Sequence, residues 1–260
     1  MKDFANKVAI VTGTTGIGRA IAKRLASGGA SVMACGIDAD ANRALQQESE
    51  AQGLAIRVEL CDVSLPEQVQ AVVAKAATEF GGLDIIANSA AIHPFGNAVE
   101  TDPETWNRCM AVNLGGVYLL SHFGIPEMVK RGGGSIVVVA SVQGHACQHG
   151  VAAYAASKGG LLSLTRALAL DHAADRIRVN SISPGSIRTP MLEHAAAHFS
   201  PDLPVDAVVA RFGAAHPLGR VGTVEEVAEL AAFLLSDRSA FCTGGDYLID
   251  GGLLAGIAVQ

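Results

Sequence analysis

The chain has 260 residues, of which half are hydrophobic and 17% are charged, as expected for an α/β domain with a large core. Its formal charge is −6 and its basic residues do not cluster, which argues against nucleic acid or an anionic membrane surface as a partner. The five cysteines are scattered and form no C-x-x-C pair, which predicts free thiols in a cytoplasmic protein. No uninterrupted apolar run approaches about 18 residues, so no transmembrane helix is expected.

Short apolar segments alternate with helical ones along the whole chain. The segments expected as strands are rich in Val and Ile and lack a clean polar alternation, which is typical of parallel strands covered on both faces. They are residues 8–12, 31–35, 56–60, 83–87, 135–139, 178–182 and 247–250. Helical periodicity indicates helices around 17–25, 39–52, 69–76, 110–128, 152–172 and 224–235. This alternation predicts one doubly wound α/β domain over residues 1–260.

One stretch, residues 186–217, departs from this alternation. It contains four prolines, a run of alanines and three histidines. A connection of this length in an α/β domain often forms a lid or a binding segment. We therefore predict that it covers a substrate site.

Glycines cluster where the first expected strand meets the first expected helix, at Gly13, Gly16 and Gly18. Glycine allows the backbone to approach a pyrophosphate closely, and the free N–H groups of the helix N-terminus can then bind it. The alternative is a tight strand-to-helix turn that binds no ligand. The position of the cluster at the first strand–helix junction favours a dinucleotide site.

Asp38 lies after the second expected strand, about 20 residues beyond the glycines, where a dinucleotide site has its ribose reader. Its carboxylate can accept from both ribose hydroxyls of NAD and would repel the 2′-phosphate of NADP. Asp38 can equally be the N-cap of the helix that follows. No cation lies at positions 36–38, although Arg19 or Arg43 could supply one. The cofactor indicated is NAD rather than NADP.

Tyr154 and Lys158 are four residues apart in an expected helix, so they share one face of it. A tyrosine with its ordinary pKa of about 10 is a poor base at neutral pH. A neighbouring ammonium favours the phenolate and makes the pair a workable general acid/base. Ser141, at the end of an expected strand, can bind the substrate oxygen. The alternative for the Tyr–Lys spacing alone is a pair on a helix surface.

With these motifs in this order, nearly the whole chain resembles the short-chain dehydrogenase/reductase family. Further segments match the family pattern in sequence order, namely CDVS, AVNLGG, PGSIRTPM and IDGG. The resemblance implies a Rossmann-type fold with a seven-stranded parallel sheet and a homotetramer. It also implies an NAD(P)-dependent oxidoreductase that interconverts a secondary alcohol and its ketone.

The resemblance implies a catalytic tetrad of Asn113, Ser141, Tyr154 and Lys158. Tyr154 would be the acid/base, and Lys158 would bind the nicotinamide ribose and lower the tyrosine pKa. Ser141 would orient the substrate oxygen, and Asn113 would hold a water that links Lys158 to solvent. The positions that match cofactor contacts of the family are Thr12, Gly13, Gly16, Ile17, Gly18, Asp38, Asp62, Val63, Asn88, Tyr154, Lys158, Ile187 and Thr189.

The sequence departs from the family pattern in three places. The glycine turn reads TGTTGIG, one residue shorter than TG-x-x-x-G-x-G, so the phosphate loop must be tighter. NSAA stands where the family usually has NNAG. Gly36 stands where the NAD-selecting acid usually lies, and Ile37 stands where NADP users often have Arg.

Four polar residues near the tetrad are candidate substrate contacts: His93, Gln143, His145 and Gln148. Such side chains suit a hydroxylated small molecule, such as a sugar or a polyol. For His145 alone, an exposed loop position is the plainer interpretation. Ala195, Ala196, Ala197 and Phe199 could instead line an apolar groove, which keeps a 3-oxoacyl-thioester ketone reductase open.

Two further alternatives follow from the same residues. His194 and His198 have a spacing that is compatible with metal binding, but no third ligand is evident. We therefore expect both on an exposed helix face, and we expect no metal site. A non-catalytic dinucleotide-binding redox sensor is the competing class of protein, and the retention of Tyr154 and Lys158 argues against it. Enoyl reductases of this lineage usually have a wider spacing between the catalytic Tyr and Lys than the four residues between Tyr154 and Lys158. This difference argues against an enoyl reductase.

Overall fold

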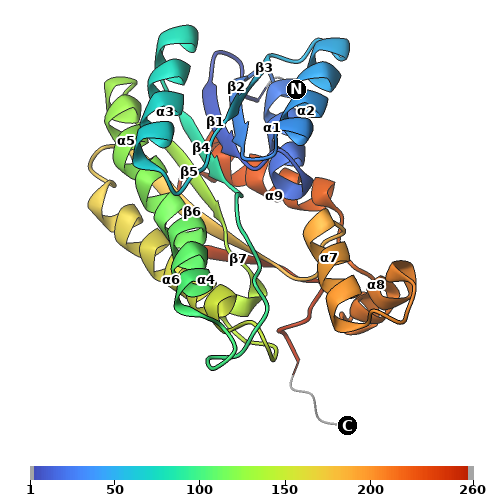
Figure 1. Ribbon diagram of the computed structural model, residues 1–260. Helices are drawn as coiled ribbons and strands as arrows, with labels where there is room; N and C mark the ends of the chain where they lie inside the picture. The colour runs from blue at the N-terminus through green and yellow to red at the C-terminus, as the bar shows by residue number, and fades with distance from the viewer. Residues whose placement is uncertain (1–2, 257–260) are drawn as a thin grey trace.

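The seven expected strands form one parallel sheet, in the order β3-β2-β1-β4-β5-β6-β7 (Figure 1). The computed structural model describes residues 3–256, so residues 1–2 and 257–260 of the predicted domain lie outside the described residues. The strands are β1 (Val8–Thr12), β2 (Ser31–Gly36), β3 (Ile56–Leu60), β4 (Ile85–Asn88), β5 (Gly134–Val139), β6 (Ile177–Pro184) and β7 (Asp246–Ile249). The predicted Rossmann-type sheet is confirmed.

Five of the seven strands differ from their predicted bounds, and the two largest differences, in β4 and β6, have a local reason. The fourth strand begins at Ile85 rather than at residue 83, although Leu83 is fully buried. The carboxylate of Asp84 accepts a hydrogen bond of 2.9 Å from the backbone N–H of Val8. Asp84 therefore bonds to the start of β1 instead of continuing β4. The sixth strand extends to Pro184 because Pro184 lies opposite Ile249 of β7.

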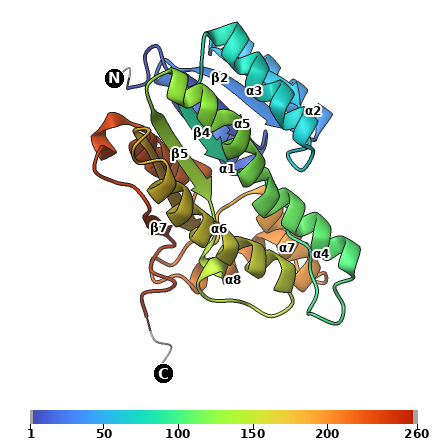
Figure 2. The same cartoon turned by 90° about the vertical axis from the view of Figure 1, so that its left-hand side faces the viewer.

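Three helices cover each face of the sheet (Figures 1 and 2). On one face lie α1 (Gly16–Ser27), α2 (Ala39–Ala51) and α9 (Val224–Leu235), which share a hydrophobic core with the sheet. On the other face lie α3 (Pro66–Phe80), α5 (Gly116–Lys130) and α6 (Ala152–Asp171), which bury a second core. Because both faces are covered, the strands carry the continuous apolar runs seen in the sequence.

The helix expected over 110–128 is longer than predicted. It starts with α4 (Pro103–Met110), passes through a π-helical turn (Ala111–Gly115) and continues as α5. This 28-residue helix is long and apolar enough to cross a membrane by length and composition alone. However, Val117, Leu120 and Met128 of α5 are buried in the core, and this burial accounts for the apolar composition.

Residues 186–217 contain two further helices, α7 (Pro190–Phe199) and α8 (Val205–Ala214). Thr189 caps α7, because its hydroxyl accepts from the N–H of Leu192 at 3.2 Å. The two helices pack on each other through Ala196, Val208 and Val209, and they stand clear of the sheet's faces (Figure 1). The segment is therefore a small helical pair beside the carboxyl ends of the strands.

The turn between β1 and α1 depends on three glycines. Gly13 and Gly16 have φ angles of +89° and +49°, in the left-handed region that favours glycine. Gly18 lies against the strand, so that a Cβ there would be 2.2 Å from the carbonyl oxygen of Gly13. Its role is to let the helix pack closely on the turn.

We expect Gly18→Ala to lower the free energy of unfolding by about 1–3 kcal/mol, because the new methyl group meets rigid backbone. Gly159→Ala in α6 is the matched control, since its Cβ would meet only an ordinary contact at 3.7 Å. That control should be neutral or slightly stabilising. Urea unfolding of both variants measures the difference, and equal stabilities would contradict the packing role of Gly18.

Candidate active site

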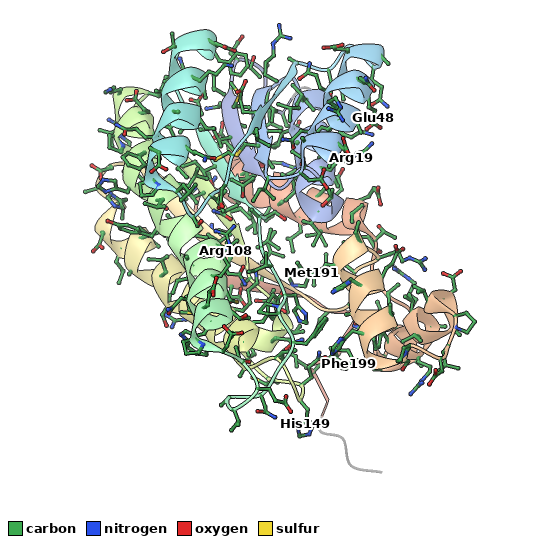
Figure 3. The ribbon with its side chains drawn as sticks, viewed as in Figure 1. Arg19, Glu48, Arg108, His149, Met191 and Phe199 are labelled. Atoms are coloured by element: carbon green, nitrogen blue, oxygen red, sulfur yellow. The ribbon has the colours of Figure 1, made fainter. Side chains whose placement is uncertain are left out.

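A cavity of about 730 Å³ opens at the carboxyl ends of the strands. Its volume is within the range of small-molecule and cofactor sites, and it lies where β1 and β4 diverge, the switch point at which open α/β sheets bind ligands. Figure 3 shows Arg108 on one side of this region and Met191 and Phe199 of α7 on the other. The predicted residues that line it are Gly13, Gly16, Ile17, Asp38, Asp62, Val63, His93, Ser141, Gln143, Gln148, Tyr154, Lys158, Ile187 and Thr189.

One end of the cavity is formed by the glycine turn and the start of α1. Thr15 is the N-cap residue, and within the described residues its side chain makes no capping hydrogen bond. The first N–H groups of α1 are therefore left for a ligand, and the positive end of the helix dipole favours an anion. This arrangement fits a pyrophosphate.

The shortened turn is held by contacts that the sequence analysis missed. The Thr14 hydroxyl donates to the Asn42 carboxamide oxygen at 2.7 Å, and the Asn42 amide donates to the Gly36 carbonyl at 2.9 Å. A Cβ at Gly36 would lie 2.5 Å from the Thr14 hydroxyl. The absence of an acid at position 36 is thus what makes room for the tighter turn.

Asp38 has the N-cap role that the sequence left open, and its role as ribose reader stays a prediction. Its Oδ1 atom accepts from the N–H groups of Asp40 and Ala41 at 2.9 and 3.0 Å, so it is the N-cap of α2. The same residue lines the cavity, beyond the end of β2. A carboxylate has enough lone pairs to cap a helix and also accept from a ribose hydroxyl.

The two arginines that could have bound a 2′-phosphate are paired with acids. Arg19 bonds to Glu48 of α2, as Figure 3 shows, and Arg43 bonds to Asp40. Neither arginine lines the cavity.

Asp62 and Arg108 form a pair on the cavity wall. The Arg108 guanidinium donates to Asp62 Oδ2 at 2.7 Å, and Ser64 donates to Oδ1 through its N–H and its hydroxyl. Burial alone would raise the pKa of Asp62, but these hydrogen bonds hold it below its ordinary value. The sequence indicated Asp62 but not Arg108, which comes from a distant helix.

Lys158 is buried at the base of the cavity, with only 3% of its surface exposed. Its ammonium donates to the carbonyl oxygen of Val139, at the end of β5, at 2.7 Å. Burial disfavours the charged form and lowers the pKa of Lys158 to about 8. The lysine is therefore close to titration at neutral pH.

Tyr154 lies beside Lys158, whose Nζ is 5.4 Å from the centre of the phenol ring. The expectation of a lowered tyrosine pKa is wrong for this structure: burial raises the pKa of Tyr154 to about 12, and the Ser141 hydroxyl only partly offsets it. The physical reason is that the ammonium is directed at the Val139 carbonyl, while the phenol is desolvated.

Asn113 lies in the π-helical turn and does not line the cavity. Its carboxamide accepts from the Ile92 N–H at 2.8 Å and donates to the Ile92 carbonyl at 2.9 Å. It also donates to the Ser157 hydroxyl at 3.0 Å. The side chain therefore anchors the loop after β4 to α6, and its water-holding role stays a prediction.

Three other predicted cofactor positions, Thr12, Gly18 and Asn88, lie behind the residues that line the cavity. The Thr12 hydroxyl accepts from the N–H groups of Ser89 and Ala90, both at 3.1 Å, and donates to Asn88 at 3.2 Å. Thr12 and Asn88 are buried, and like Gly18 they are absent from the cavity lining.

His93 makes edge-on contact with the Tyr154 ring, with centroids 4.2 Å apart at an interplanar angle of 66°. Burial, and then the charge of Lys158, lower the pKa of His93 to about 4. The imidazole is therefore neutral at physiological pH.

Phe95 connects His93 to α7. The His93 and Phe95 rings are 4.9 Å apart, and Phe95 stacks on His198 of α7 at 3.9 Å with an interplanar angle of 8°. His194 stacks on Phe95 more distantly, at 5.7 Å. The two lid histidines, expected on an exposed helix face, are exposed but also stack on this ring. In residues 3–256, no three His, Cys, Asp or Glu side chains gather as metal ligands.

His145 is a predicted substrate contact that the structure places elsewhere. Its Nε2 is 2.7 Å from Asp246 Oδ2, and it does not line the cavity, because this pairing holds it against β7. The structure adds a set of apolar wall residues that sequence spacing does not bring together, namely Ala146, Met191, Leu192, Ala195, Phe199, Phe212, Leu253 and Leu254. Five of them, from Met191 to Phe212, lie in the stretch 186–217 that was predicted to cover a substrate site, whereas Ala146, Leu253 and Leu254 carry no such signal in the sequence.

Comparisons with known proteins agree with this geometry. A family model described as enoyl-(acyl carrier protein) reductase matches residues 11–254. Cyclohexanol dehydrogenase of Acinetobacter sp. (strain SE19) is 38% identical over 250 residues, which is 95% of each chain. The chain belongs to the short-chain dehydrogenase/reductase family. It is an oxidoreductase that acts on CH–OH groups, in a family that binds nicotinamide dinucleotides.

Solved structures give the same result. Ligand-free aldohexose dehydrogenase of Thermoplasma acidophilum superposes with a TM-score of 0.91 at 33% identity, covering 100% of this chain and 98% of that one. An actinorhodin polyketide ketoreductase with NADPH superposes with a TM-score of 0.91 at 32% identity, covering 97% of this chain and 98% of that one. The family's known substrates therefore differ widely on one scaffold.

The neutral state of His93 predicts a pH dependence of stability. An unfolded chain protonates this histidine below about pH 6.5, whereas the folded chain protonates it only near pH 4. The free energy of unfolding should therefore fall as the pH drops through this window, by at most about 3 kcal/mol from this group. In His93→Phe this part of the loss should disappear.

Urea unfolding at several pH values between 4 and 7 measures the effect. His122→Phe, at an exposed position on α5, is the matched control and should follow the unmodified protein. Parallel pH curves for His93→Phe and the unmodified protein would contradict the buried neutral state.

Proposed function

We propose that this protein interconverts a secondary alcohol and its ketone with NAD, using Tyr154 as the general acid/base. The observation that carries the proposal is the meeting of Ser141, Tyr154 and Lys158 at the base of one cavity whose other end has the free N-terminus of α1. The names of the relatives, a cyclohexanol dehydrogenase and an aldohexose dehydrogenase, support a secondary alcohol as substrate.

Ser141 and Tyr154 would bind the reacting oxygen from two sides. The Ser141 hydroxyl already accepts from the Gln143 N–H at 3.1 Å, which fixes the oxygen and leaves its proton free to donate to the substrate. In alcohol oxidation, the O–H proton passes to Tyr154 as the carbinol C–H leaves as hydride and the C=O bond forms. Bound NAD would supply the two-electron oxidant that takes up this hydride, and the positive charge of its oxidised form would favour the phenolate of Tyr154.

The high pKa of Tyr154 affects ketone reduction and alcohol oxidation differently. With a pKa of about 12, Tyr154 holds its proton at neutral pH and is ready to donate it to a ketone. As a base it must first lose that proton, which nearby positive charge favours. Lys158, whose ammonium lies at the end of β5, would hold the nicotinamide ribose and contribute part of that charge.

Tyr154→Phe should lower kcat by about 10²–10⁴-fold, because a general acid/base contributes a factor of this size. The NADH dissociation constant should change little, since the phenol is not the main cofactor contact. Lys158→Met should lower kcat and also weaken NADH binding. Steady-state kinetics on cyclohexanol with NAD, together with calorimetric titration, measure both effects.

Tyr118→Phe, at an exposed position on α5, is the control for removal of a phenolic hydroxyl. Full activity of Tyr154→Phe would refute the acid/base role. Unchanged NADH affinity in Lys158→Met would refute the ribose contact.

The preference for NAD rests on charge at the ribose end of the cavity. Asp38 lines this end, and the candidate cations Arg19 and Arg43 are both paired with acids. A 2′-phosphate would meet a carboxylate there without a free cation.

Asp38→Asn should reduce the preference for NADH over NADPH by about tenfold, because it removes the repulsive charge. Asn is as good an N-cap as Asp, so α2 should remain stable. Asp102→Asn, which alters the N-cap of α4, is the matched control. Calorimetric titration with each cofactor tests this, and an unaltered preference would assign selectivity to another residue.

Two further parts of the proposal rest on the family and on surface composition. A homotetramer is supported by exposed apolar side chains on the long helices, with Tyr118 54% and Leu170 81% exposed. Trp106, on α4, is 39% exposed as well. A cytoplasmic location is supported by the dispersed cysteines, all five of which are free thiols.

A second candidate substrate is a 3-oxoacyl thioester. The apolar wall formed by Met191, Leu192 and Phe199 could accept an acyl chain, and the likeness to a polyketide ketoreductase favours it. The pairing of Arg19 and Arg43 disfavours the NADPH that this neighbour holds. The alcohol dehydrogenase is therefore the first choice.

A further inference from the structure

Two side chains beside the reacting centre have buried polar atoms with no hydrogen-bond partner in residues 3–256. They are Nδ1 of His93 and Oε1 of Gln143, and both residues line the cavity. The same is true of Asn88 Nδ2 and Thr165 Oγ1, but these residues are not part of the cavity wall. Because a buried polar atom without a partner is costly, the first two are positioned to bind a ligand.

Both side chains lie next to the groups that would hold the reacting oxygen. The His93 ring contacts the Tyr154 ring edge-on at 4.2 Å. Gln143 follows Ser141 by two residues, its backbone N–H donates to the Ser141 hydroxyl at 3.1 Å, and the residue lines the same cavity as Ser141. A group bound by them would therefore lie close to the carbinol carbon.

The two side chains indicate a neutral partner that can donate and accept. The Gln143 carboxamide carries no charge, and the buried imidazole of His93 is neutral at physiological pH. A neutral imidazole has one donor and one acceptor nitrogen, so a hydroxyl can bind it in either orientation. A carboxylate or a phosphate would instead need a cation, and the two cations on the cavity wall have other roles: Arg108 pairs with Asp62, and Lys158 is assigned to the nicotinamide ribose.

The opposite wall constrains the rest of the substrate. It is formed by Met191, Leu192 and Phe199 of α7, with Phe212 and Leu253 beyond them. Figure 3 shows Met191 and Phe199 directed from α7 towards the helix that carries Arg108. These side chains offer no hydrogen bonds, so a fully hydroxylated sugar would leave its outer hydroxyls unpaired there.

We propose that His93 and Gln143 form a subsite for a second hydroxyl, so that the substrate is a vicinal diol, or its hydroxyketone, with a compact and largely apolar remainder. The inference rests on the proposed function. The second hydroxyl takes no part in the redox step and serves only to orient the carbinol carbon.

Matched pairs of alcohols test the subsite in the unmodified protein. With NAD, kcat/KM is measured for cyclohexanol against cyclohexane-1,2-diol, and for butan-2-ol against butane-2,3-diol. The diols should be preferred by at least about tenfold, because a buried hydrogen-bonding group is left unpaired by the mono-alcohols.

Variants assign that preference to the two residues. His93→Phe and Gln143→Met keep the side-chain size but lose the polar atoms, and each should reduce the diol to mono-alcohol ratio by about fivefold or more. His122→Phe and Gln70→Met, at exposed positions on α5 and α3, are the matched controls and should keep the ratio. NADH titration of each variant reports whether its cofactor site is intact.

The outcomes separate the subsite from the activity. Preference for the diols that is lost in both variants, with NADH binding intact, supports the subsite. Equal rates for diols and mono-alcohols, or a ratio that both variants keep, would overturn the subsite and leave the alcohol dehydrogenase in place. Absence of NAD-linked turnover for all four alcohols would overturn the proposed function and this inference with it.

Discussion

The site is organised around a lysine whose charge is buried at the end of the sheet. Lys158 is almost completely enclosed, and its ammonium is held by the carbonyl oxygen of Val139, where β5 ends. A buried charge is tolerated only with such a partner, so the contact determines how α6 lies across the strand ends. Because Tyr154 lies one turn before Lys158 on the same helix face, that placement also brings the phenol to the cavity. Ser141 reaches the same point from the end of β5.

The cofactor end shows how a shortened loop is compensated. Removing one residue from the phosphate turn brings Thr14 close to the end of β2, where only a glycine leaves room for it. Asn42 then ties the turn to the carbonyl of Gly36. As a result position 36 cannot carry the usual ribose-reading acid, and Asp38 is the acid that remains on the cavity wall. The shortened turn and the glycine at position 36 are therefore parts of one local change.

The substrate end depends on contacts between segments that are far apart in the chain. Phe95, from the loop after β4, stacks on His198 of the lid helix and touches His93, which in turn contacts Tyr154. This line of ring contacts joins α7 to Tyr154. The cavity has an apolar wall, formed by side chains of α7, and a polar wall with His93 and Gln143. A substrate with one polar edge and an apolar remainder would match both walls.

The sequence by itself determined the features that depend on local order. Strand and helix periods predicted the doubly wound sheet, glycine spacing predicted the turn before α1, and the spacing of Tyr154 and Lys158 predicted a shared helix face. Only the tertiary structure decided the features that depend on what surrounds a residue. Burial raised the pKa of Tyr154, pairing with Asp246 took His145 away from the cavity, and the π-helical turn committed Asn113 to the loop after β4. Such features could not be derived from spacing, because solvation and partners come from segments distant in sequence that only the folded chain brings together.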